Sequence, residues 1–251
     1  MKIVISPTKK MKVDTDSYEI LGMPVFLTET ERIMKWMRSL SLDVAKQLWG
    51  CNQKIAEQNF ERFSKMDLYK GLTPAILSYE GIQFQYMSPG VFSENALEYI
   101  NKHLRILSGY YGVLAPFEGI TPYRLEMQAK AKIDGYNDLY EFWGDKLYQA
   151  VLDDDKVIIN LASKEYSKCI EKYLSEDITF ITIVFGELIN GKVVQKGTMA
   201  KMARGEMVRY MAEHGIEHSE QIKNFDVSGY CFKEELSSHQ EFVFIKESNT
   251  N

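Results

Sequence analysis

The sequence predicts a mixed α/β fold, a single compact domain with a central β-sheet surrounded by helices. Short apolar runs rich in Val and Ile alternate with longer segments whose apolar residues recur at helical spacing. The 251 residues are 45% hydrophobic, which is enough for one sizeable core. With 6 Pro, 16 Gly and no repeat, low-complexity segment or linker, the chain is expected to form one domain over residues 1–251.

The N-terminal part is expected to begin with a strand and to continue with helices. The run KIVIS at residues 2–6 is apolar and β-branched, and Pro7 ends it. Residues 29–69 carry three amphipathic stripes at helical spacing. Thr28 and Glu31 have the spacing of a capping box for the first of these helices.

The middle of the chain contains one ambiguous segment. Residues 75–88 suit either a helix or a hairpin, since Glu80-Gly81 lies between two apolar runs. Ser93 can cap a helix over 94–103, as Ser41 can in the helical region before it. The apolar run that follows, from residue 104, predicts the next strand.

Helices and strands alternate in the second half. Asn190-Gly191 predicts a hairpin turn, and Gly215-Ile216 ends a long helix. The expected elements, in order, are a helix over 138–151, a strand over 157–161, a helix from 164, a strand over 178–185, a helix over 198–214, a short helix over 219–224 and strands around 227–232 and 242–245.

Charge and cysteine content exclude several function classes. A formal net charge of −5 argues against a protein that coats nucleic acid through its overall field, although a local basic cleft stays compatible with it. The three cysteines are odd in number and form no CxxC, so we expect no disulfide framework and no cysteine-based metal centre. The apolar runs are too short for a signal peptide or a membrane span, and we expect a soluble cytoplasmic protein with no membrane partner.

Three predicted strands end in Ser and lead into a turn or helix start that carries Lys or Tyr. They are IVISPTK at 3–9, RILSGYYG at 105–112 and INLASKEY at 159–166. If the strands are parallel neighbours, one cleft opens beyond their carboxyl ends, and free N–H groups at helix starts favour an anion there. The residues expected to line this cleft are Ser6, Lys9, Ser108, Gly109, Tyr111, Ser163, Lys164 and Tyr166, with Tyr123, Arg124 and Glu126 from the loop after the second strand.

This pattern suits a phosphate, a nucleotide or a nucleic-acid backbone; the alternative is that Ser and Gly merely end the strands. An enzyme acting on a nucleotide or nucleobase could use Lys9 as nucleophile or clamp, with Tyr111, Tyr123 and Arg124 around it. The chain has no P-loop, dinucleotide-binding, nucleophile-elbow or zinc-protease motif, so no activity is assigned. Because His and Cys do not cluster, we expect no metal and no cofactor.

The helix over 198–214 is a second candidate. Lys201, Arg204 and Gly205 share one face by the helical period, and Gly205 would allow a backbone to approach closely. A helix, a Gly-containing turn and a second helix can present N–H groups to DNA phosphates. The alternative is a purely structural helix pair, since acidic residues dilute the charge of this helix.

Seven segments in one order resemble the YaaA family of bacterial peroxide-stress proteins over nearly the whole chain. They are ISPTK at 5–9, LYKGL at 68–72, LRILSGYYGVLAPFEGITPYRLEM at 104–127, LYEFWGDKL at 139–147, INLASKEYSK at 159–168, AKMARGEMVRY at 200–210 and FDVSGYCF at 225–232.

The resemblance implies a family-specific YaaA-like fold with a helix-hairpin-helix element and a positively charged cleft that binds DNA without sequence preference. It also implies protection against DNA damage by iron and hydrogen peroxide, with no established catalytic activity. We place the hairpin element at 199–224, with 107–112 as the competing position. The sequence departs from the family pattern at Thr8 and Lys70, and at Ala115, where the family often has Arg, so one cleft base is missing.

Overall fold

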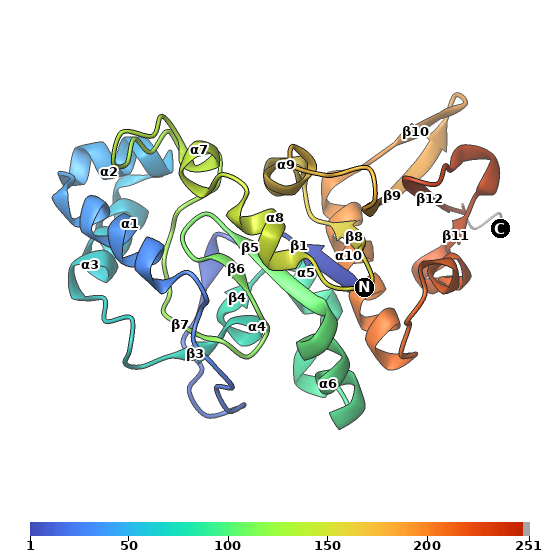
Figure 1. Ribbon diagram of the computed structural model, residues 1–251, viewed down its shortest axis with the longest axis horizontal. Helices are drawn as coiled ribbons and strands as arrows, with labels where there is room; N and C mark the ends of the chain where they lie inside the picture. Colours follow the sequence, from blue (N-terminus) through green and yellow to red (C-terminus); the bar gives the residue numbers. More distant parts are fainter. Residues whose placement is uncertain (248–251) are drawn as a thin grey trace.

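The structure is a computed structural model that describes residues 1–247 (Figure 1). Its main sheet is formed by β1 (Lys2–Ile5), β5 (Leu104–Ser108), β6 (Gly112–Leu114), β8 (Val157–Leu161), β9 (Thr179–Ile189), β10 (Lys192–Val194), β11 (Tyr230–Phe232) and β12 (Glu241–Lys246). Two small sheets pair β2 (Lys10–Met11) with β4 (Tyr79–Glu80), and β3 (Thr73–Pro74) with β7 (Gly119–Ile120).

Helices flank this sheet. The α-helices are α1 (Leu27–Ser39), α2 (Leu42–Trp49), α3 (Gln53–Lys65), α4 (Ala75–Ser78), α5 (Ile82–Met87), α6 (Glu94–His103), α7 (Leu139–Trp143), α8 (Lys146–Val151), α9 (Lys164–Glu171) and α10 (Gly197–Glu213). The 3-10 helices are η1 (Pro89–Val91), η2 (Ser219–Asn224), η3 (Val227–Gly229) and η4 (Glu234–Leu236). Helices α1 to α3 gather at one end of the molecule, opposite β10 to β12 (Figure 1). Within residues 1–247, no helix combines the length and the apolar character that crossing a bilayer requires.

The sheet is mixed, with strand order β11-β12-β9-β8-β1-β5-β6 and β10 paired to β9. Its centre is parallel: Ile5 of β1 lies opposite Ile106 of β5 on one side and Leu161 of β8 on the other. The side chains of Ile3, Val4 and Ile5 are fully buried, as expected for a central strand covered on both faces. The predicted mixed α/β fold with a central sheet is therefore confirmed, and the three strands singled out in the sequence are parallel neighbours.

Two of the three side-chain caps predicted at helix starts are confirmed. Ser41 and Ser93 each accept a hydrogen bond from the backbone N–H three residues further on. The capping box predicted at Thr28 is wrong, because α1 begins two residues earlier than predicted, at Leu27, with Phe26 in the cap position and no side-chain cap.

Two predicted elements are subdivided. The helix predicted over 138–151 is interrupted at Gly144, which separates α7 from α8. The ambiguous segment 75–88 forms α4, β4 and α5, and Glu80-Gly81 does not make a hairpin. Its strand instead pairs with distant β2, where Lys10 lies opposite Glu80.

The C-terminal region follows the predicted order with shorter elements. The long helix is α10, and the short second helix is the 3-10 helix η2. The strand predicted over 227–232 begins as η3 and becomes extended only at Tyr230. Residues 107–112, the competing position for a helical hairpin, connect β5 to antiparallel β6 and contain no helix.

Glu118, in the turn before β7, is expected to make the stability of the folded protein depend on pH. Burial raises the pKa of its carboxyl from 4.5 to about 7, even though the Ala115 N–H and Arg105 act in the opposite direction. The folded protein therefore retains a proton that the unfolded chain loses between pH 4.5 and about 7. Stability contributed by this proton is present below that window and is lost as the pH rises through it.

Replacing Glu118 with Gln is expected to remove this dependence and to raise the free energy of unfolding at pH 8 by about 1–3 kcal/mol. Urea titrations of both proteins at pH 5 and pH 8 measure the free energies of unfolding. The difference between the two proteins should grow with pH. An equal difference at both pH values would contradict the assignment of the raised pKa to Glu118.

Candidate anion-binding site

The candidate site begins where β1 and β8 end side by side. Ser6 follows β1, and Ser163 follows β8 as the N-cap of α9. The Ser6 hydroxyl oxygen accepts a hydrogen bond from the Ser163 N–H at 2.8 Å, and the Ser6 hydroxyl donates to the Ser163 hydroxyl oxygen at 3.2 Å. These two bonds fix the start of α9 at the carboxyl edge of the sheet.

A cavity of about 440 Å³ opens at this edge. The pairing of β2 with β4 brings residues 80–83 next to Lys9 and Lys10, and α10 supplies the far side. Residues from five separate segments of the chain therefore meet around one space. The residues predicted from the sequence that line the cavity are Ser6, Lys9, Tyr123, Arg124, Glu126, Ser163, Tyr166, Lys201 and Arg204.

Four of the predicted residues lie elsewhere, three of them because β5 turns back at once into antiparallel β6 instead of opening toward the cleft. Ser108 and Tyr111 are buried beneath the loop 123–127. Gly109 packs against the same loop, where an added Cβ would lie 2.7 Å from the Leu125 carbonyl oxygen. Lys164 is turned away from the cavity and pairs with Glu171 of its own helix.

A chain of hydrogen-bonded, buried hydroxyl groups holds one wall of the cavity in place. The Ser108 oxygen accepts hydrogen bonds from the N–H groups of Tyr110 and Tyr111 at 3.1 and 2.9 Å. With both lone pairs occupied, its hydroxyl donates to the Tyr123 oxygen at 2.6 Å, and the hydroxyl groups of Tyr123 and Tyr79 share a hydrogen bond at 2.8 Å. Burial raises the pKa of the Tyr123 phenol, so this group stays neutral. Ser108 therefore holds in place a residue that lines the cavity.

Most charges around the cavity are paired. Glu126 Oε1 forms ion pairs with Lys9 at 2.9 Å and with Arg124 at 3.3 Å, and Lys10 pairs with Glu80 at 3.1 Å. The Lys9 side chain is 62% exposed, whereas a nucleophilic lysine needs burial or a neighbouring cation. Its position suits an electrostatic clamp better than a nucleophile. Across residues 1–247, no three His, Cys, Asp or Glu side chains gather as they would to hold a metal ion.

Arg204 and Lys201 line the cavity without an ion pair to any carboxylate of residues 1–247, and of the two only Lys201 is exposed. The Nε of Arg204 is buried without a hydrogen-bond partner. Removal from water, with no compensating partner, lowers the pKa of its guanidinium. A cation in such a position is costly unless an anion joins it. Arg204 is therefore the strongest single indication of a ligand in this cavity.

Gln83, which sequence reasoning missed, lies on the same side of the cavity. Only 6% of the residue is exposed, and its side-chain Nε2 has no partner among the described residues. Gln83 lies in α5, inside the segment whose structure the sequence left ambiguous, so no local signal marks it. The close approach predicted at Gly205 does occur, but the approaching backbone is that of α5: a Cβ there would lie 2.2 Å from the Gln83 carbonyl oxygen. Gly205 is thus buried inside the protein.

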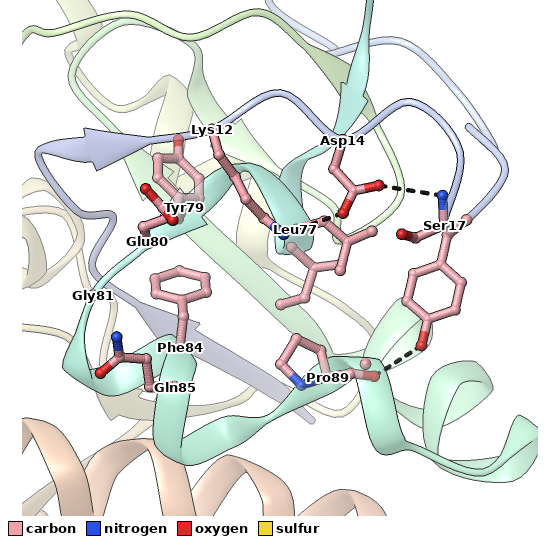
Figure 2. Close-up of a pocket in the computed structure, with 13 residues that line it drawn as sticks. Lys12, Asp14, Ser17, Leu77, Tyr79, Glu80, Gly81, Phe84, Gln85 and Pro89 are labelled. Carbon is pink, nitrogen blue, oxygen red and sulfur yellow. Dashed lines mark hydrogen bonds and ion pairs between the residues drawn. The ribbon is translucent and has the colours of Figure 1, made fainter.

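A second cavity, of about 450 Å³, shares Glu80 and Gly81 with the first (Figure 2). Several of its polar groups bond to one another. Lys12 pairs with Asp14 at 3.1 Å, and Asp14 accepts the Ser17 N–H at 3.2 Å. The Tyr18 hydroxyl donates to the Pro89 carbonyl at 2.9 Å. Because these groups already have partners, this cavity gives less reason to expect a charged ligand.

Comparison with known proteins agrees with the segments seen in the sequence. The family model described as "Peroxide stress protein YaaA" matches residues 1–236. A protein of Agathobacter rectalis is 57% identical over 247 residues, which are 98% of this chain and 99% of the relative. Relatives from Pediococcus pentosaceus and Lachnoclostridium phytofermentans are 53% and 52% identical, and each comparison covers at least 98% of both chains. All three relatives carry the name UPF0246 protein. The chain belongs to the YaaA family of peroxide stress proteins.

Proposed function

We propose that this protein binds DNA at the cationic cavity and thereby limits iron- and peroxide-driven damage to the DNA. One observation carries the proposal. In a chain with a net charge of −5, five cationic side chains from three separate segments surround a single cavity. They are Lys9, Lys10, Arg124, Lys201 and Arg204. Membership of the peroxide-stress family supports the physiological role.

The arrangement suits contact with phosphates. Lys9, Lys10 and Lys201 are exposed, so they can reach a backbone that runs across the cavity mouth. Phosphate contacts position nucleic acid without reading its sequence. We assign the helix-hairpin-helix element to α10, the turn at Gly215 and η2, because α10 carries Lys201 and Arg204 to the cavity.

Protection from iron follows from the same charges. DNA holds a condensed layer of counterions, and a protein that neutralises phosphates releases them. Fe(II) is a divalent counterion, so bound protein displaces it from the phosphates that it covers. Less iron then reacts with peroxide next to the sugar and bases. The effect on iron is indirect and requires no iron site in the protein.

The test is DNA binding measured at increasing salt. We expect affinity to fall steeply with salt, and replacement of Lys9 and Lys201 together by Met to reduce the slope of log K against log salt by about 1–2. Replacement of Lys65 by Met is the control, since this exposed lysine lies in α3 and pairs with Glu61. Absence of binding at low salt, or equal slopes for the double variant and the control, would contradict the proposal.

A further inference from the structure

We propose that Gln83, Arg124 and Arg204 form a site for a phosphate monoester at the inner end of the cavity. Such a group is carried by a nucleotide or by the end of a broken DNA strand. The inference rests on the proposed function in using the same cavity, and it names the chemical group that the cavity selects.

The first support is the unpaired charge of Arg204. Its guanidinium is withdrawn from water, and no carboxylate in the described part of the chain neutralises it. Lysines at the mouth can be solvated, but a partly buried guanidinium without a partner has lost hydration and gained nothing for it. A phosphate oxygen pair matches the geometry of a guanidinium and restores both the charge balance and the hydrogen bonds.

The second support is that the site is held in place by close packing. Gln83 is nine-tenths buried, and its amide Nε2 is a donor without an acceptor among residues 1–247. The backbones of α5 and α10 approach so closely at Gly205 that only a residue without Cβ fits against the Gln83 carbonyl. The backbones that carry Gln83 and Arg204 are therefore fixed relative to each other before any ligand arrives, which reduces the entropic cost of binding.

The third support is charge. Three acidic side chains, Glu80, Glu126 and Glu165, line the cavity beside the five cations. Glu126 offsets only one of the two cations that contact it, Lys9 and Arg124. The cavity therefore carries two positive charges in excess. A phosphate monoester carries a charge of about −1.5 to −2 at pH 7, whereas an internal phosphodiester of DNA carries only one negative charge.

The cavity also has room for more than the phosphate. Its volume of about 440 Å³ lies within the range of pockets that hold whole small-molecule ligands. Arg204 borders, in addition, an open polar hollow of about 880 Å³ formed with β8, β9 and residues around Gln240. A nucleotide, or the last nucleotides of a strand, can therefore extend from a phosphate held at Arg204.

Fluorescence polarisation tests the strand end, with a short oligothymidylate that carries a 5′-phosphate, a 3′-phosphate or only hydroxyl ends. Thermal shift with AMP and with inorganic phosphate tests the free ligands. We expect a phosphorylated strand to bind about tenfold tighter than the hydroxyl strand, and AMP to raise Tm. Arg204→Met should abolish both effects without lowering the Tm of the free protein, because it removes an unpaired charge. Arg209→Met is the control, since Arg209 lies in the same helix but pairs with Glu213.

The outcomes separate this inference from the proposed function. Equal binding of all strands, with no response to AMP or phosphate, overturns the phosphate site and leaves DNA binding standing. A response to AMP that depends on Arg204, without binding of any strand, supports the site for a free nucleotide and overturns DNA binding. Equal losses in Arg204→Met and Arg209→Met overturn the assignment to Arg204.

Discussion

Gly205→Ala is expected to destabilise the protein by about 3 kcal/mol, at the upper end of the usual cost of overpacking. The added Cβ would lie 2.2 Å from the Gln83 carbonyl oxygen and 2.9 Å from the Met87 N–H nitrogen. Both atoms belong to backbone, so no side chain can rotate away and α10 must move off α5. Since Arg204 is the neighbouring residue, the same movement is expected to disturb the cavity.

Gly197→Ala is the matched control for this change. Gly197 is the first residue of the same helix, and a Cβ there would meet nothing within 4 Å. Alanine is the better helix former, so this variant should be as stable as the wild type or slightly more stable. Urea unfolding measures both free energies. Equal stability of the two variants would show that α10 yields to the extra methyl group, contrary to the packing argument.

Gly205 also illustrates what a helical period can predict. The 3.6-residue repeat predicted that Gly205 shares a face with Lys201 and Arg204 and leaves room there for a bound backbone, but Gly205 is packed against the backbone of α5. It could not identify the contacting backbone, because that depends on where α5 lies. The segment containing α5 was ambiguous, since its helices are only four and six residues long and its strand pairs with distant residues. Gln83 was missed for the same reason.

The residues that follow the three strands show again that a local sequence pattern can predict an element without predicting what packs against it. The apolar runs predicted β1, β5 and β8, and parallel pairing brought Ser6 and Ser163 into hydrogen-bonding contact. The equivalent Ser108 did not join them, because the chain after β5 reverses into β6. The pattern of a strand ending in Ser is local and is the same in all three segments. The direction that the chain takes afterwards is decided by distant packing, including the loop that covers Gly109.

Ser108→Ala is expected to destabilise the protein by about 3 kcal/mol, although the change removes a single oxygen atom. That oxygen accepts two backbone N–H groups and donates to Tyr123, and all of these groups are buried. Each buried polar group left without a partner costs about 1–3 kcal/mol. The loss of three partners at once, reduced by local relaxation, gives the expected value. Urea unfolding compares it with Ser64→Ala, whose hydroxyl is exposed and bonds only to the Glu61 carbonyl.

Tyr123→Phe separates two contributions to this cost. One is the pair of hydrogen bonds that Ser108 accepts from the backbone, and the other is the hydrogen bond that joins Ser108 to the Tyr123 hydroxyl. Phenylalanine removes the hydroxyl between Ser108 and Tyr79, but the two N–H groups keep their acceptor on Ser108. We therefore expect Tyr123→Phe to cost less than Ser108→Ala, by about 1 kcal/mol or more. The reverse order would mean that the turn after β5 relaxes to bond its own N–H groups. Ser108 would then act mainly through Tyr123 and the side of the cavity that Tyr123 lines.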